Sequence, residues 1–481
     1  MSSGFHFVAN LKPYTLHRGV GNRRFGAYLL SVDYARELAD LARETVSDGA
    51  VLCADNGNYD LIRAFIEKQS AAATTLRAER GALRRSRPSD IPVDLRRRHL
   101  DFARSIRDAA KVAVTREHVV EVVRTQSAMQ ATYCIGMEDF TIATLTALGV
   151  ESGFLGTERR FFEALAKRAV DFATDTAEGR YGPAPGKVFA GVHASDYDTA
   201  ILAGQVAGSA GVAGIATGFV GALQDKSYVD YLLEDEHVLE LGARIPRPYV
   251  RVAQIAAGLH EGFVKKAGRR PAFHALGAGS PILLPLLAAL GDGKTYTATD
   301  STAPIVDGWS GATISLYVSD PAPLKYKAYR IVEEWLANDR PWGCPCPYCR
   351  AFDRAYPPRI DEARRWWQRQ SNRRLTAESV RATSPLSGWL PLFGNASDPG
   401  LRLTGAMARV GHNHWVLQRI ESEARQHSSS HESLVAWIDG VVRSYTTWAA
   451  DPQWKQAVEQ AWRILRRAAV ATRGVAATPL R

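Results

Sequence analysis

Residues 186–195 read GKVFAGVHAS, and the shape of this stretch recurs along the chain. An apolar run of β-branched and small residues ends at a polar residue or a glycine, and a helical pattern follows. Six stretches have this shape: GAVLCADNGN (49–58), ATYCIGMEDF (131–140), GKVFAGVHAS (186–195), AGIATGFVGA (213–222), PAFHALGAGS (271–280) and KTYTATDSTA (294–303). Strands that alternate with helices are typical of a parallel sheet whose faces are covered by helices. Six such units in about 250 residues predict an α/β fold of the (β/α)8 TIM barrel type, with an open doubly wound sheet as the alternative.

The bulk composition is that of an ordinary globular protein. The chain has 481 residues, of which 46% are hydrophobic and 23% charged, enough for a sizeable core. No run reaches the roughly 20 apolar residues that a membrane helix needs, and the opening MSSGFHFVANLKPYTLH lacks the apolar core of a signal peptide. We therefore expect a cytoplasmic protein without a membrane partner. In that reducing compartment, clustered cysteines bind metal rather than form disulfides.

The charge balance favours a polyanionic partner such as nucleic acid. The net charge is +10 and the pI is about 9.4. The positive charge is concentrated between residues 77 and 107, which hold ten arginines and four acidic residues. This stretch is either a solvated helix with its loop or a surface that contacts phosphates. We assign it to an insertion in the barrel at about residues 70–112.

Several chemically versatile residues lie where the predicted strands end. They are Asp55, Glu138 with Asp139, His193, Gly218 and Asp300. In a barrel the carboxyl ends of the strands form one mouth, and catalytic residues come from there. A structural interpretation is also open, because Asp55 could cap the helix that starts near residue 58 and Asp300 could close a turn before Pro304. The shared placement at strand ends favours an active site at the mouth.

A second candidate site is the cysteine cluster in GCPCPYCRAF, residues 343–352. The thiolates of Cys344, Cys346 and Cys349 can converge on one ion in a tight turn, which the interspersed prolines support. Three thiolates and one imidazole are a usual ligand set for Zn²⁺. We expect His412, at the predicted start of a helix, as the fourth ligand, with His414 as its competitor. Four protein ligands leave no open position for a substrate, so the zinc is expected to be structural.

The chain changes character after the predicted barrel. We place the barrel in residues 1–340, a zinc-binding subdomain with a barrel-closing helix in residues 341–425, and a helical extension in residues 426–481. Residues 371–411 are loop-like in composition, with SPLSGWLPLFGNASDPG in the middle. The C-terminal residues show helical patterns with recurring tryptophans, which we expect to pack against the rest of the fold.

Four segments resemble the tRNA-guanine transglycosylase superfamily. The C-x-C-x-x-C cluster with a distant His-Asn pair is similar to the zinc subdomain of that family. ADNGNY (residues 54–59) resembles its Asp-Ser-Gly-Gly segment, and FHALGAGSPILLPLLAALG (273–291) resembles its His-x-x-Gly-x-Gly-x-Pro segment. YTATDSTAPIVDG (296–308) resembles its Phe-Asp-x-x-x-Pro segment, and Asp300 falls at the position of the family's nucleophilic aspartate. The likeness extends from about residue 51 to about residue 425 and is strongest in residues 273–349.

The resemblance implies a specific reaction. Members of the family are (β/α)8 barrels with an inserted zinc site, and they exchange a guanine in nucleic acid for a 7-deazaguanine base such as 7-cyano-7-deazaguanine. By this likeness, Asp300 attacks the sugar C1′ to form a covalent glycosyl-enzyme, and Asp55 acts as general acid and base. The base-binding positions fall on Glu138 or Asp139, on His193, and on Gly218 or Phe219.

Departures from the family pattern favour a divergent branch. Asn56 and Asn58 replace the serine and the second glycine of Asp-Ser-Gly-Gly, His193 replaces a glutamine, and Phe219 replaces a glycine. These changes fall in substrate-facing parts, whereas the two catalytic aspartates are kept. We therefore expect the branch that places 7-deazaguanines in DNA, with tRNA as the alternative polymer. A non-catalytic nucleic-acid-binding subunit and an unrelated metalloenzyme with catalytic zinc are the rival hypotheses. Whether the chain forms a homodimer or works with partner proteins stays open.

Overall fold

The core of the structure is a closed barrel of eight parallel strands. The computed structural model describes residues 4–11, 25–38, 40, 50–82, 91–150, 158–225, 227–234, 237–309, 315–327, 343–355 and 399–475. The barrel strands are β1 (Phe5–Asn10), β2 (Ala27–Ser31), β3 (Val51–Asp55), β4 (Tyr133–Ile135), β5 (Lys187–Gly191), β6 (Gly214–Gly218), β9 (Ala272–Leu276) and β10 (Thr297–Ser301). They pair in the order β1-β10-β9-β6-β5-β4-β3-β2, and β2 closes the ring on β1. The predicted barrel is confirmed and the open sheet is excluded; the six recurring segments are β3 to β6, β9 and β10.

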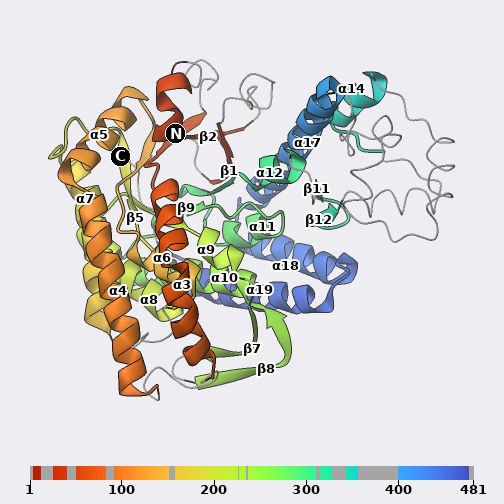
Figure 1. Ribbon diagram of the computed structural model, residues 1–481. Helices are drawn as coiled ribbons and strands as arrows, with labels where there is room; N and C mark the ends of the chain where they lie inside the picture. The colour runs from red at the N-terminus through yellow and green to blue at the C-terminus, as the bar shows by residue number, and fades with distance from the viewer. Residues whose placement is uncertain are drawn as a thin grey trace.

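Helices surround the barrel, as Figure 1 shows. They are η1 (Val32–Tyr34), α3 (Tyr59–Ala82), α4 (Val93–Ala113), α5 (Arg116–Ala128), α6 (Thr141–Leu148), α7 (Arg159–Ala177), α8 (Tyr197–Ala210), α9 (Val220–Gln224), α10 (Arg247–Ala267), α11 (Leu283–Ala288), α12 (Ala303–Trp309), α14 (Pro347–Ala355), α17 (Pro399–His427), α18 (His431–Trp448) and α19 (Pro452–Ala471). Two antiparallel hairpins are inserted, β7 (Tyr228–Glu234) with β8 (His237–Pro246) and β11 (Ser315–Val318) with β12 (Leu324–Lys327).

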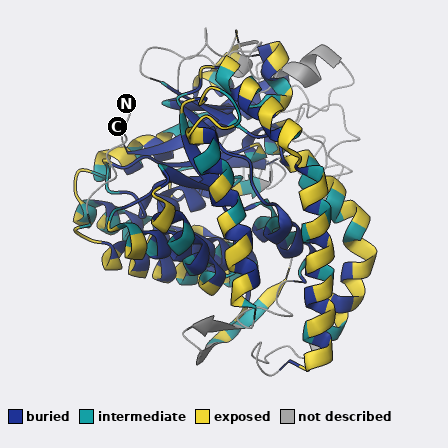
Figure 2. Cartoon of the chain, turned by 90° about the vertical axis from the view of Figure 1, so that its left-hand side faces the viewer, coloured by how far each residue is buried: buried dark blue, intermediate teal, exposed yellow. Residues whose placement is uncertain are grey.

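Alternation along the strands separates the barrel interior from its outer face. The interior contains a cluster of buried, mostly apolar side chains, among them Val8, Leu29, Ile135, Phe189 and Ala298. The other residues of the strands face outward and pack against the helices. The barrel strands are therefore mostly dark blue in Figure 2, whereas the helices are yellow on their outer faces. A polar side chain inside this barrel therefore has few polar groups within hydrogen-bonding distance.

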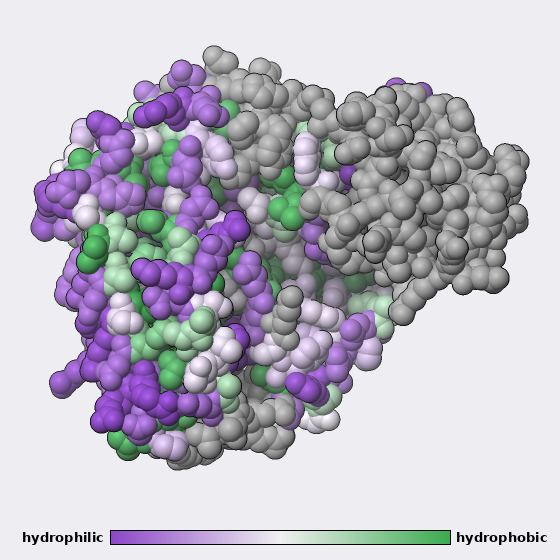
Figure 3. Space-filling view, in the orientation of Figure 1, coloured by the Kyte–Doolittle hydropathy of each residue, from purple (hydrophilic) through white to green (hydrophobic). Residues whose placement is uncertain are grey.

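The arginine-rich insertion includes the solvated helix α4. Arg97 and Arg98 pair with Asp94 at 2.7 and 3.2 Å, and Arg104 pairs with Asp101 at 3.2 Å. Figure 3 shows mostly hydrophilic side chains on the side of the molecule where α4 lies. Exposed pairs of this kind contribute little to stability, but they offset the positive charge locally. This part of the insertion fits the solvated-helix interpretation, and residues 83–90 lie outside the described residues.

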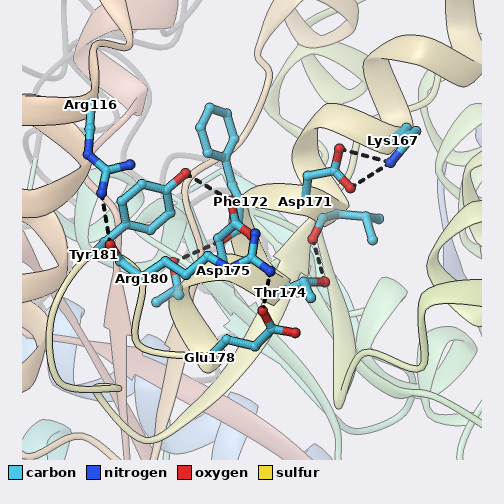
Figure 4. A network of polar contacts seen from close by, with 11 residues as sticks. Arg116, Lys167, Asp171, Phe172, Thr174, Asp175, Glu178, Arg180 and Tyr181 are labelled. Carbon is cyan, nitrogen blue, oxygen red and sulfur yellow. Dashed lines mark hydrogen bonds and ion pairs between the residues drawn. The ribbon is translucent and has the colours of Figure 1, made fainter.

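A polar network fixes the far end of the barrel, away from the mouth (Figure 4). Arg180 follows α7 and pairs with Asp175 at 2.8 Å and with Glu178 at 2.7 Å. Arg116 at the start of α5 donates a hydrogen bond to the carbonyl of Arg180 and lies over the ring of Tyr181. Because this segment leads from α7 into β5, the network anchors the amino end of that strand.

Helix α17 covers the seam where the first and last barrel strands meet. It packs against β1, α11 and α12, as expected of a barrel-closing helix. Two sequence predictions are wrong here. Residues 399–411, expected to be loop-like, are helical, and His412 lies well inside α17 rather than at its start. Pro399 is tolerated in the first turn, and packing on the barrel stabilises the rest of the helix despite its composition. The rest of the expected loop, residues 371–398, lies outside the described residues.

The C-terminal helices α18 and α19 pack together, and α19 lies along α10. Trp462 is buried, and its indole N–H donates a 2.7 Å hydrogen bond to Asp439. The expected packing of tryptophans is therefore confirmed for Trp462, whereas Trp448 is 56% exposed. In the part of the chain that the structure describes, no helix has both the length and the apolar character needed to cross a membrane.

Helices α8 and α10 approach each other through glycines on both partners. They are Gly204 and Gly208 on α8 and Gly258 and Gly262 on α10. A Cβ added at Gly262 would lie 2.1 Å from the carbonyl oxygen of Ile201, and one at Gly204 would lie 2.2 Å from that of Leu259. Because backbone occupies this space, a side chain at either position forces the helices apart.

We expect Gly262→Ala to lower the free energy of unfolding by about 1–3 kcal/mol, because overpacking of a helix contact has costs of that order. Thermal or urea unfolding measures the change. Gly440→Ala in α18 is the matched control, since the nearest atom to its added Cβ is 3.9 Å away. The control should be neutral or should stabilise the protein by up to ~1 kcal/mol. Equal effects of the two substitutions would contradict the packing argument.

Candidate active site and metal centre

The barrel brings the predicted site residues to one mouth. Asp55 and Gly218 are the last residues of β3 and β6, and Asp300 lies next to the end of β10. Glu138 and His193 follow β4 and β5 by three and two residues. Since all eight strands are parallel, their carboxyl ends form the same rim. The candidate residues therefore converge although they are far apart in the sequence.

Asp300 is buried and held from three sides. Its Oδ2 accepts a 2.9 Å hydrogen bond from the side-chain amide of Asn10, at the end of β1. Its Oδ1 accepts a 3.3 Å hydrogen bond from the backbone N–H of Gly277, and Nε2 of His274 lies 3.3 Å from the same oxygen. Burial lowers the pKa of His274, but hydrogen bonds and charge interactions with Asp300 and Cys53 outweigh burial and raise it to about 9. The carboxylate therefore faces an imidazolium at neutral pH.

Asp55 has a different environment. It is partly exposed at the mouth, and its Oδ1 accepts a 2.9 Å hydrogen bond from the N–H of Asn56. Burial, together with the neighbouring carboxylates of Glu138 and Asp300, raises the pKa of Asp55 to about 7. Among the described residues, no cation forms an ion pair with it. A substantial fraction of Asp55 is therefore protonated at neutral pH.

The two asparagines that depart from the family pattern brace the Asp55 segment. The side-chain amide of Asn56 donates to the carbonyl of Gly136 at 2.9 Å, and that of Asn58 lies 3.0 Å from the sulfur of Met137. Gly57 between them has φ of +75°, and an added Cβ there would lie 2.7 Å from Val32. Both asparagines thus tie the segment after β3 to the segment after β4, which carries Glu138.

Glu138 and His193 form a close pair. Nε2 of His193 lies 2.5 Å from Oε2 of Glu138, and both side chains are buried. Burial lowers the pKa of His193, but the charge of Glu138 and the hydrogen bond to it outweigh burial, and the net shift is upward. The neighbouring glycines leave room for the pair: a Cβ at Gly191 would lie 3.0 Å from Glu138, and one at Gly218 would lie 3.3 Å from the His193 ring.

The geometry separates the alternatives that the sequence left open. Oδ1 of Asp139 accepts the N–H of Thr141, and Oδ2 pairs with Arg168 of α7 at 2.8 Å, so both oxygens are engaged away from the mouth. Glu138, not Asp139, faces Asp55. Phe219 is fully buried in the core, and its N–H donates to the carbonyl of Leu276. The expectation that Phe219 offers a backbone contact to a base is therefore wrong, because that donor is already used.

Charges at the mouth follow a simple pattern. Two carboxylates, Asp300 and Glu138, each have an imidazole partner, His274 and His193. The third, Asp55, has none among the described residues and has the raised pKa. Carboxyl groups whose environments push their pKa values apart are suited to different roles, one as proton donor and another as anion. The mouth can therefore combine a nucleophilic carboxylate with a protonated acid.

Sequence reasoning missed three residues at the mouth or just beneath it. Asn10 lies on a strand that the recurring pattern did not include, so no signal pointed to it. His274 lies in a motif of the resemblance, but its place inside the barrel follows only from the register, in which it pairs with Ala298. Tyr59 is 51% exposed at the first residue of α3, four positions after Asp55, where its ring is accessible to a ligand.

The cysteine cluster can hold a metal ion. One ligand atom from each of Cys344, Cys346, Cys349 and His412 lies within 4.8 Å of the others. Nδ1 of His412 is 3.3 Å from the sulfur of Cys344 and 3.7 Å from that of Cys349. Bonds of about 2.0–2.3 Å to one tetrahedral ion would separate such atoms by roughly 3.5 Å. Contacts with the other two thiols lower the pKa of Cys346, which favours the thiolate that a metal requires.

The second nitrogen of His412 explains why this histidine is the ligand. Its Nε2–H donates a 2.8 Å hydrogen bond to the carbonyl of Tyr317, and this bond orients the ring so that Nδ1 faces the thiols. His414 instead uses Nδ1 to donate to the carbonyl of Val410, one turn earlier in α17. The placement of the two side chains confirms the preference for His412 over His414 as the fourth ligand, although neither residue lies at a helix start.

Comparison with known proteins identifies no family for this chain. No protein-family model matches the chain, and no curated protein matches it. The barrel, its mouth and the Cys3His cluster therefore carry the functional argument.

We expect His412→Gln to abolish stoichiometric metal binding and to lower the melting temperature, because structural metal sites contribute on the order of 10 kcal/mol of binding energy. His414→Gln is the matched control, with a buried histidine two residues away, and should retain one metal ion per chain. Elemental analysis of the purified proteins and thermal unfolding measure both effects. Full metal content in His412→Gln would contradict the assigned ligand set.

Proposed function

We propose that this chain is a guanine transglycosylase that exchanges a guanine in DNA for a 7-deazaguanine base. One observation supports this above the others: Oδ1 of Asp300 lies 3.3 Å from Nε2 of His274, whereas Asp55, on the same rim, has a pKa raised to about 7. Exchange at a glycosidic bond requires such a pair, one group to trap the sugar and one to handle protons. The resemblance in sequence assigns these roles to the same two residues.

In the first half of the reaction, an oxygen of Asp300 forms a bond to C1′ of the nucleotide. The bond between C1′ and N9 breaks, and its electron pair stays with the departing guanine, which takes the proton of Asp55. Positive charge develops on the sugar as the bond breaks, and the carboxylate stabilises it before trapping it covalently. Because a paired base is out of reach, the target nucleotide must be unpaired or flipped out.

In the second half, the incoming base replaces the ester. Asp55, now ionised, removes the N9 proton of the 7-deazaguanine, N9 attacks C1′, and Asp300 leaves as a carboxylate. The proton count is then restored and no water is consumed. Asn10 and Gly277 donate hydrogen bonds to the carboxylate and hold it in place through both steps.

Glu138 and His193 fit the recognition of a 2-amino-6-oxopurine. A carboxylate can accept hydrogen bonds from N1–H and the exocyclic amine of such a base, and an imidazolium can donate one to its 6-oxo group. The close pair places the His193 imidazole beside the carboxyl group of Glu138. The exposed ring of Tyr59 is a candidate stacking surface for the base.

We further propose Zn²⁺ as the ion of the Cys3His cluster, in a structural role. Three thiolates and one imidazole are typical of closed zinc sites, which stabilise folding and offer no position to a substrate. DNA is preferred as the polymer because the sequence departs from the family pattern at Asn56, Asn58 and His193, which favours a divergent branch of the family. The net charge of +10 suits either nucleic acid.

The wild-type protein should release labelled guanine from DNA when 7-cyano-7-deazaguanine is supplied. Asp300→Asn should abolish the release, because the amide is a poor nucleophile and no glycosyl-enzyme forms. Radiolabel release and a denaturation-resistant protein–DNA adduct are the measurements. Asp171→Asn, an exposed site on α7 that pairs with Lys167, is the control and should react as the wild type does. Release from tRNA alone would overturn the choice of polymer, and full activity of Asp300→Asn would contradict its role as nucleophile. A wild-type protein that releases no guanine from either polymer would favour a binding subunit.

The rate of adduct formation should fall as pH rises through about 7, the pKa of Asp55. The rate falls with rising pH because Asp55 must be protonated to donate to the leaving guanine, and the protonated form is lost above its pKa. The slope should approach tenfold per pH unit at high pH. Single-turnover measurements between about pH 5.5 and 9 test this. Asp55→Asn should remove the decline in rate at high pH and should also remove most of the rate itself. A rate that stays constant to pH 9 would contradict the assignment.

A further inference from the structure

His274 lies inside the barrel, one level below Asp300. It is on β9, its Cα is paired in register with that of Ala298 on β10, and it is 1% exposed. Its Nε2 is 3.3 Å from Oδ1 of Asp300, the oxygen that also accepts the N–H of Gly277. Its ring meets that of Tyr296 edge to face, with centroids 6.3 Å apart. The imidazole therefore touches the nucleophile on the side away from the mouth.

The other titratable groups around His274 are weak acids or another imidazole. Cys53 from β3 interacts with it and lies 3.3 Å from the hydroxyl of Tyr296. Tyr133 from β4 and His6 from β1 lie behind Tyr296, with ring centroids 4.6 and 5.6 Å from it. Among the described neighbours, Asp300 is the one carboxylate within ion-pair distance of His274.

A charged imidazole at this level of the barrel requires a counter-charge. The surrounding interior is largely apolar, with Leu29, Ile135 and Ala298 in the same cluster. An unpaired buried cation would lose its proton there, because desolvation disfavours the charged form. His260 shows this outcome: it is equally buried on α10, and burial lowers its pKa to about 3. His274 shifts the other way because Asp300 is beside it.

We propose that His274 is a positioning residue for Asp300, an imidazolium that keeps the nucleophile ionised and fixes the direction of its oxygens. This inference rests on the proposed function and adds a group that does not touch the substrate. His274 transfers no proton in the cycle. When the C1′ ester forms, the charge on Asp300 is lost, and the buried imidazolium is left without its counter-ion. When the incoming base displaces the ester, the returning carboxylate regains its counter-ion, which favours its departure.

The charge on His274 can be measured without any assay of activity. In protein labelled at histidine with ¹⁵N, the resonances that vanish in His274→Gln identify His274. We expect these to report a doubly protonated ring up to about pH 9 in the wild type, and a neutral ring by pH 7.5 in Asp300→Asn. His260 should stay neutral throughout and serves as the internal control. A neutral His274 at pH 7 in the wild type would overturn the proposal. If His274→Gln does not fold, the response to Asp300→Asn identifies the signal.

Kinetics test the positioning role itself. Gln keeps an N–H donor but no charge, so His274→Gln should lower kcat by about ten- to a hundredfold, the equivalent of a hydrogen bond to a charged group. KM for the base should change little, because His274 does not reach it. In the pH profile of kcat/KM, the rise on the acidic side (the acid limb) should move to higher pH, because Asp300 loses its proton less readily without the adjacent cation. His260→Gln is the matched control and should keep the wild-type limb.

The two proposals fail in different ways. A wild-type protein that exchanges no base, but whose His274 titrates near pH 9 in an Asp300-dependent manner, contradicts the transglycosylase function and leaves the ion pair established. A wild-type protein that exchanges bases, with kcat and acid limb unchanged in His274→Gln, contradicts the positioning role and leaves the function intact.

Discussion

The closure of the barrel between β1 and β10 is the constraint on which the site depends. Parallel pairing sets Val8 opposite Asp300 and brings the end of β1 beside β10. Asn10 can then donate to Asp300 across 290 positions of sequence. An open sheet would leave these two strands at opposite edges, and the carboxylate would lose one of the groups that hold it. The same seam needs a cover, and α17 supplies it by packing on β1.

The metal cluster contributes to that cover. His412 on α17 is fixed between the thiols and the carbonyl of Tyr317, and the next residue, Asn413, donates to the carbonyls of Pro304 and Ser315. Pro304 is in α12, which directly follows β10. An ion held at the cluster would thus stabilise the helix that also holds the segment after Asp300. A closed ligand set is suited to this scaffolding role because it leaves no site for chemistry.

Electrostatics at the mouth depend on where imidazoles are placed. Three carboxylates on one rim repel one another, and this repulsion contributes to the raised pKa of Asp55. Asp300 and Glu138 each have an imidazole within ion-pair distance, His274 and His193, whereas Asp55 has none among the described residues. This unequal placement of counter-charges is therefore a property of the assembled barrel. No single strand contains both members of either pair.

The sequence by itself determined the barrel, the cysteine ligands and the catalytic candidates. Strand and helix periodicity is local, and so is the spacing of Cys344, Cys346 and Cys349, so both can be read without coordinates. Tertiary structure decided the features that depend on strands distant in sequence. It placed Glu138 rather than Asp139 at the mouth, and it placed His274 beneath Asp300. It also overruled local composition in residues 399–411, where packing on the barrel stabilises a helix. Side-chain direction and ionisation are set by neighbours across the barrel, and a linear pattern contains no information about which strand will become the neighbour.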